Sequence, residues 1–179
     1  KFWPVVKEFW QELGFLVNVE IPEAGIMETD WAENRAKLPQ DILRGTLGKV
    51  FDSLYSTAER DKFRTRLEKS AETGMVEIYI SHRGMYEVYT NEGKTDTRWQ
   101  PRPADPELEA EMLGRLMVRL GVEESRAKTM IAADQRQDRA KLSRATDGAG
   151  ALLLEEPFDR AWRRVGLALE RDGFTVEDR

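Results

Sequence analysis

The hydrophobic period of this chain changes at Gly14, from the period of a helix to the period of a strand. Within residues 2–13, apolar side chains recur three and four positions apart, as on one face of a helix: Val6, Phe9, Trp10 and Leu13. Pro4 suits the first turn of that helix, and Gly14 is a natural C-terminal stop. From Phe15 to Ile21 apolar and other residues alternate, as in a strand. A helix followed at once by a strand predicts a mixed fold of the α+β class.

Alternation returns in three later stretches, which we interpret as further strands of an antiparallel sheet. They are residues 26–31, residues 61–69, and residues 75–90 as a strand pair or one bulged strand interrupted at Arg83-Gly84. Residues 34–58 lack clean periodicity, and we expect an elaborated loop with helical turns there. Residues 91–104 are polar and rich in proline, so they are predicted to be a loop.

A second helix is predicted over residues 105–120. Asp105 is a favourable N-cap and Pro106 a favourable first helical residue. One wide apolar face runs along this helix to Gly121, formed by Leu108, Met112, Leu113, Leu116, Met117 and Leu120. Residues 122–148 are highly charged with scattered apolar residues, which suggests a linker that is partly helical.

The end of the chain repeats its beginning at a shift of 159 residues. The shift aligns Trp3 with Trp162, Val6 with Val165, Gly14 with Gly173, Phe15 with Phe174, and Val17 with Val176. These positions are the helix anchors, the helix-stopping glycine and one strand face, so a duplicated unit is plausible. In the second copy we expect a strand at 151–155, a helix at 157–171 and a strand at 174–177. We therefore predict a first domain at 1–121 whose first strand is missing, a linker at 122–148, and a second, truncated domain at 149–179.

The composition excludes several classes of function. The chain has 179 residues with no Cys and one His, so we expect no disulfide, no metal site and no cofactor. The net charge is −5, which offers no general attraction to nucleic acid. The longest apolar runs have three or four residues, and none is expected to span a membrane. An enzyme is not expected from this inventory.

The remaining chemical motifs have ordinary structural interpretations. Residues 44–49 resemble a phosphate-binding loop only superficially, because the first glycine and the final Ser or Thr are absent. His82 is predicted to be a hydrogen-bonded structural histidine facing the core, since no nucleophile motif accompanies it. Glu28 and Asp30 share a strand face and could hold a proton or a cation, although a solvated face is the commoner role.

Two features bear on a protein partner. Lys62, Arg64 and Arg66 form a basic stripe, diluted by nearby acidic residues including Asp61, so cross-strand ion pairing is expected. A mixed aromatic, acidic, amide and basic cluster lies where the strand at 26–31 enters the irregular loop, and this composition is typical of an interface. We predict an interaction surface there, made by Trp31, Glu33, Asn34, Arg35 and Lys37.

Several long stretches resemble the NlpB/DapX lipoprotein family. They are Trp3 to Val6, Met27 to Lys37, Asp61 to Glu68, Ile80 to Met85, and Asp105 to Leu113. The resemblance covers residues 1–120 well and residues 149–179 more loosely.

The resemblance implies two helix-grip domains joined by a linker, in which an antiparallel sheet grips a long C-terminal helix. It also implies a non-catalytic scaffold or interaction subunit of the outer-membrane β-barrel assembly machinery. Its partners would be other subunits of that machinery. It would be located on the periplasmic side of the outer membrane. The family's N-terminal lipidated Cys and extended contact segment have no counterpart in these residues, so both would precede Lys1.

Two alternatives remain open at this point. The chain could be a carrier that binds a lipid or another small apolar ligand between helix 105–120 and the sheet, with Met112, Leu116, Met117 and Leu120 lining the groove. Residues 151–155 could also add as a strand to the first domain of the same or a neighbouring copy.

Overall fold

The computed structural model describes residues 1–32, 59–70, 74–134, 140–144, 148–172 and 174. The chain divides into two compact units, Lys1–Val122 and Glu123–Arg179. The described residues form antiparallel sheets and four α-helices, which confirms the predicted α+β class. The expected loop at 34–58 lies outside the described residues.

Helix α1 spans Trp3–Glu12, as the apolar spacing predicted, and its residues Val6, Phe9 and Trp10 are buried. After the helix, the backbone N–H of Gly14 donates to the Gln11 carbonyl at 2.9 Å, and the chain turns into strand β1, Val17–Ile21. The predicted change of period at Gly14 is therefore confirmed as a helix-to-strand junction.

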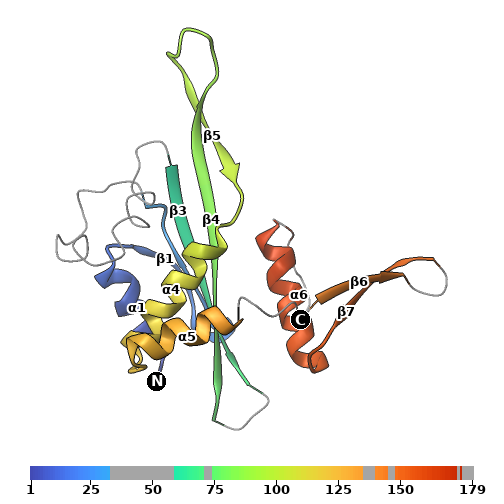
Figure 1. Ribbon diagram of the computed structural model, residues 1–179. Coiled ribbons are helices and arrows are strands. Elements are labelled where there is room, and N and C mark those ends of the chain that lie inside the picture. The colour runs from blue at the N-terminus through green and yellow to red at the C-terminus, as the bar shows by residue number, and fades with distance from the viewer. Residues whose placement is uncertain (33–58, 71–73, 135–139, 145–147, 173, 175–179) are drawn as a thin grey trace. The chain divides into compact units, whose positions relative to one another are not determined.

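Five antiparallel strands follow one another in chain order across the sheet of the first unit (Figure 1). They are β1, β2 (Ile26–Thr29), β3 (Glu59–Lys69), β4 (Val76–Tyr89) and β5 (Thr97–Arg102). A short 3₁₀ turn, η1 (Pro22–Ala24), joins β1 to β2 and ends at Gly25, whose φ is +66°. A Cβ at this position would lie 2.0 Å from the Leu67 carbonyl oxygen, so the close approach of β3 requires glycine here.

Two sequence predictions fail at the β4–β5 hairpin. Strand β4 continues without interruption through Arg83 and Gly84, and residues 97–102, expected in a loop, form β5. The polar composition of β5 hid it, because this edge strand is stabilised by its pairing with β4 over 84–89 rather than by an apolar face. Pro101 is compatible with this position because an edge strand leaves one side of its backbone unpaired.

Helix α4 spans Pro106–Arg119, which confirms the predicted helix and its start. The Asp105 side chain caps it by accepting from the backbone N–H groups of Glu107 and Leu108, at 3.0 and 3.1 Å. One core joins α1 and α4 to the same face of the sheet, through Val6, Phe9, Trp10, Leu13, Phe15, Met27, Phe63, Leu108, Met112 and Leu116. The rings of Trp10 and Phe63 stack at its centre, 5.0 Å apart.

The second unit contains helix α5 (Glu124–Asp134), a two-stranded antiparallel sheet of β6 (Ala140–Arg144) and β7 (Gly150–Leu154), and helix α6 (Phe158–Arg171). The charged stretch 122–148 thus holds a helix and a strand as well as connections. Of the strand expected at 174–177, only residue 174 is described. Strand β7 pairs with β6 in this structure. The division of the chain into helix-grip domains stays a prediction.

Candidate functional site

The sequence places an interaction surface at Trp31 and the residues after it. Trp31 is half-buried, its backbone N–H donates to the Asp30 carboxylate at 2.8 Å, and the Lys62 ammonium lies 5.1 Å from its ring centre. This is a cation–π contact between β3 and the end of β2. The other four residues of the predicted surface, Glu33, Asn34, Arg35 and Lys37, lie outside the described residues. The surface therefore stays a prediction, with one of its five members located.

The acidic and basic residues beside Trp31 pair across the strands. The Glu28 carboxylate lies 2.5 Å from the Lys62 ammonium and 3.8 Å from the Arg64 guanidinium. The expected cross-strand ion pairing of the basic stripe is thereby confirmed for Lys62 and Arg64. The Glu28 carboxylate is engaged in this pairing rather than in holding a metal cation. Arg66, the third member of the stripe, is only 8% exposed, and its guanidinium lies 3.3 Å from the Glu68 carboxylate of the same strand.

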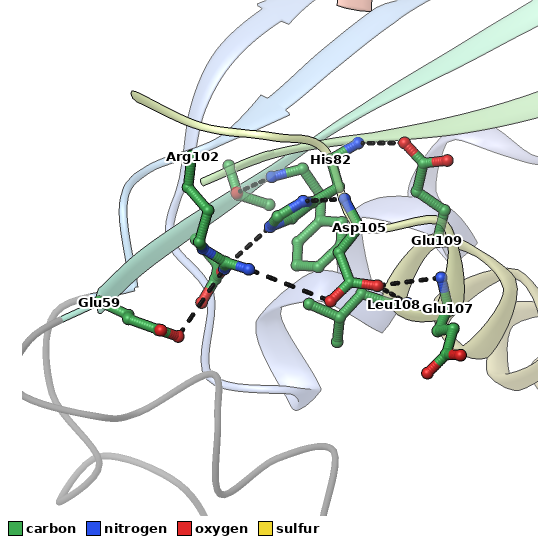
Figure 2. Close-up of polar contacts among 10 residues, drawn as sticks. Glu59, His82, Arg102, Asp105, Glu107, Leu108 and Glu109 are labelled. Atoms are coloured by element: carbon green, nitrogen blue, oxygen red, sulfur yellow. Dashed lines mark hydrogen bonds and ion pairs between the residues drawn. The ribbon is translucent and has the colours of Figure 1, made fainter. Parts of the chain in front are cut away.

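A buried polar cluster occupies the core face of the same sheet. It joins Asp61 of β3, His82 of β4, Arg102 of β5 and, from the start of α4, Asp105 and Glu109 (Figure 2). Asp61 and His82 are completely buried. Asp61 was expected to dilute the basic stripe, and this expectation is wrong. Its strand parity places it with Phe63 and Thr65, on the core face.

The hydrogen bonds of His82 determine which ring nitrogen carries the proton. The Asp105 backbone N–H donates to Nδ1 at 2.9 Å, so Nδ1 is unprotonated. The proton therefore lies on Nε2, which donates to the Asp61 carboxylate at 2.6 Å. Both ring nitrogens are occupied, which confirms the prediction of a hydrogen-bonded structural histidine.

The side chain of Arg102 on β5 reaches Asp61 on β3 by passing over Gly84 of β4. Asp61, Gly84 and Arg102 lie opposite one another on three neighbouring strands. The guanidinium of Arg102 passes over Gly84 and contacts the Asp61 carboxylate. A Cβ on Gly84 would lie 2.8 Å from Arg102 Nε, so the absent side chain leaves room for this ion pair. The sequence signal for the pair is Gly84 itself, which was read instead as a strand interruption.

Two acidic residues, Asp105 just before α4 and Glu109 in its first turns, attach the helix to the sheet. Asp105 donates its backbone N–H to His82 while its side chain caps α4. One turn later, Glu109 accepts the backbone N–H of His82 at 2.9 Å. The cluster therefore orients the start of α4 against β4. Sequence analysis identified the cap of α4 but missed this second role, because it depends on a strand 23 residues away.

Neither ring nitrogen of His82 is open to a substrate, because both are hydrogen-bonded inside the protein. A general base needs a nitrogen within reach of its substrate, and both nitrogens of His82 are already bonded inside the core. Among the residues that the structure describes, no group of three or more His, Cys, Asp or Glu side chains is placed to hold a metal ion. No helix in these ranges is long and apolar enough to cross a membrane.

The groove proposed for a carrier is occupied by the protein's own side chains. Met112 and Leu116, two of its four expected lining residues, are at most 1% exposed and belong to the core. Leu120 is 37% exposed at the end of the helix. The packing of α4 therefore gives the carrier interpretation no support.

Among the described residues of the second unit, Glu123 and Glu155 have carboxyl groups with shifted pKa values. The hydroxyl and backbone N–H of Ser125, with the N–H of Arg126, donate to Glu123 and lower the pKa of its carboxyl. This is the arrangement of an acidic residue capping the start of α5. The Lys141 ammonium, 2.5 Å away, lowers the pKa of Glu155.

Comparison with known proteins shows the family to which the chain is similar. Residues 1–134 match the model of the "Outer membrane protein assembly factor BamC-like N-terminal domain". No solved structure matches the chain.

Three curated relatives align along nearly the whole chain. A protein of Accumulibacter regalis named outer membrane protein assembly factor BamC is 66% identical over 181 residues, which cover 100% of this chain and 47% of the relative. A protein of the same name from Thiobacillus denitrificans is 68% identical, covering 99% of this chain and 47% of the relative. An uncharacterized protein of Neisseria meningitidis serogroup B is 44% identical, covering 98% and 44%. The chain thus spans about half the length of these relatives.

Proposed function

The chain belongs to the BamC-like N-terminal domain family of outer membrane protein assembly factors, and from this premise we propose that it is a non-catalytic interaction subunit of the outer-membrane β-barrel assembly machinery. Its partners would be other subunits of that machinery. The full-length protein would act on the periplasmic side of the outer membrane, held there by an N-terminal lipid anchor. The resemblance to the NlpB/DapX family is confirmed by the family match and by two relatives named BamC.

The observation that carries the non-catalytic part is the state of His82. It is the single histidine of the chain, it is completely buried, and both of its ring nitrogens are hydrogen-bonded within the protein. Its neighbours Asp61 and Arg102 pair with each other rather than opening toward a substrate. The polar cluster is thus suited to fixing α4 on the sheet, with His82 fully engaged in doing so.

We place one contact surface at Trp31, Glu33, Asn34, Arg35 and Lys37. The support comes from Trp31, a half-buried tryptophan held over Lys62 at the end of β2. Tryptophan beside a cation is typical of the residues that contribute most to protein interfaces. The same Lys62 ammonium also pairs with the Glu28 carboxylate at 2.5 Å, so Trp31 lies beside a paired acidic and basic residue.

The proposed architecture is two helix-grip domains. Helix α4 packed on a five-stranded antiparallel sheet agrees with the first domain. In the second unit, β7 followed by α6 agrees with the start of another copy. Large side chains of α6 are exposed there, Phe158 at 80% and Trp162 at 51%. Such an apolar face is expected of a helix that packs on a larger sheet. Exchange of strand 151–155 between copies is a further possibility that size measurements in solution would test.

Co-purification of the full-length protein from membrane extract tests the proposed function. We expect other subunits of the barrel-assembly machinery to be retained in stoichiometric amount. Their absence from a folded, membrane-associated preparation would refute it.

The Trp31 surface needs a separate experiment. A photo-crosslinking amino acid at position 31 should yield crosslinks to a machinery subunit, whereas the same residue at Leu16, which is 69% exposed, serves as the matched control. Crosslinks from position 16 alone would place the contact elsewhere and would leave the subunit assignment intact.

A further inference from the structure

Strand β4 is longer than the strand that covers its outer edge. It has 14 residues. On one side, its residues 76–86 pair with β3, whereas on the other side only its residues 84–89 pair with β5. Figure 1 shows β5 beside only the C-terminal part of β4. Among the described residues, no strand pairs with the outer edge of residues 76–83.

The direction of the backbone groups along this edge follows from two hydrogen bonds. Phe63 and His82 are opposite each other, yet the Phe63 N–H donates to Thr29 Oγ1 and the His82 N–H donates to Glu109. Phe63 and His82 are therefore a non-hydrogen-bonded pair, with backbone groups directed away from each other. The pattern repeats at every second residue, so the N–H and C=O of Ile80, Ile78 and Val76 also point outward.

The side chains along this edge are those of a strand that accepts a neighbour. Val76, Ile78 and Ile80 alternate with Glu77 and Tyr79, and the two isoleucines pack against the core. Residues 76–81 contain no proline, lysine or arginine. Such residues usually protect exposed edges from pairing, and the edge strand β5 has both Pro101 and arginines.

We propose that the outer edge of residues 76–81 binds an extended polypeptide as an added strand, with apolar residues at alternate positions and a basic residue between them. Glu109 limits the site at His82, so about six residues, roughly 20 Å of extended chain, would fit. Backbone hydrogen bonds to Val76, Ile78 and Ile80 would supply affinity, and their side chains would select the apolar positions.

Charge and pattern favour this occupant. Glu77 lies within this edge segment of β4, so a basic side chain at the facing position of the added strand would form an opposite-charge cross-strand pair with it. Alternation of apolar and polar residues is the pattern of strands in outer-membrane barrels. The choice of an outer-membrane barrel strand as the partner rests on the proposed function, whereas the open edge of β4 does not.

Amide hydrogen exchange of the 179-residue chain with a synthetic peptide tests the inference. The probe is an acetylated, amidated octapeptide with valine at alternate positions and threonine and lysine between them. We expect saturating peptide to slow exchange of the Val76, Ile78 and Ile80 amides at least tenfold. The same peptide with N-methyl groups on all backbone nitrogens, which leaves neither of its edges an N–H donor for β4, should give no protection.

Variants of the edge provide a second measurement. Val76→Pro and Ile78→Pro each remove one outward N–H and should weaken peptide binding at least tenfold, while Val76→Thr, which keeps the N–H, should not. If a proline variant fails to fold, the N-methylated peptide still decides the question.

Three outcomes would overturn the inference: no protection of the three amides, equal protection by the N-methylated peptide, or protection that rises with protein concentration without peptide. The last would show that a second copy occupies the edge. None of these outcomes bears on co-purification with the assembly machinery, so the two proposals fail separately.

Discussion

Replacement of His82 by phenylalanine tests the assignment of the polar cluster as a structural device. Phenylalanine keeps a ring against Phe63, whose centre lies 5.2 Å from the imidazole, but loses both ring nitrogens. The Asp105 N–H then lacks its acceptor, and Asp61 loses the donor at 2.6 Å while keeping Arg102. A buried polar group left without a partner costs about 1–3 kcal/mol. Two such losses, one of them partial, predict a decrease of about 2–5 kcal/mol in the free energy of unfolding.

Urea denaturation followed by tryptophan fluorescence measures this loss, because Trp10 lies in the same core as His82's neighbour Phe63. His82→Gln is the matched control, since its side-chain amide can still donate toward Asp61. It should lose about 1–3 kcal/mol, the cost of the Asp105 amide alone. A loss below about 1 kcal/mol for His82→Phe would refute the hydrogen-bond assignment.

Three further substitutions examine other parts of the fold. Thr65→Val removes the acceptor of the Trp10 indole N–H, 2.9 Å away between two fully buried side chains, and should cost about 1–3 kcal/mol in thermal denaturation. Gly25→Ala should destabilise by at least about 1–3 kcal/mol through its positive φ alone, and the clash with the Leu67 carbonyl should add to this in the same assay. Glu123 has a lowered folded pKa, so its stabilisation of α5 is present above its ordinary value of 4.5 and is lost as pH falls through the folded value. Between about pH 5 and pH 2, NMR shifts of the Ser125 and Arg126 amides, which donate to Glu123, should change more in the wild type than in Glu123→Gln.

Local sequence was sufficient to predict the features that depend only on neighbouring residues, namely the starts of helices and the alternation of strands. The starts of α1 and α4 follow from Pro4 and from Asp105-Pro106, because caps and proline act within one turn of the helix. The alternation over residues 61–69 predicted a strand there, since successive side chains of a strand point to opposite faces, and β3 spans Glu59–Lys69. The family was likewise recognisable from sequence, because the stretches that resemble it are long.

The tertiary structure alone decided the rest. Strand β5 has no apolar alternation, and it exists because β4 supplies its hydrogen bonds. Gly84 appeared to interrupt β4, whereas it provides the space through which Arg102 reaches Asp61. The proton position on His82 depends on Asp61, 21 residues before it, and on Asp105, 23 residues after it. A sequence specifies periodicity and caps locally, but the partner of a buried polar group depends on which strands meet, and only the folded chain brings them together.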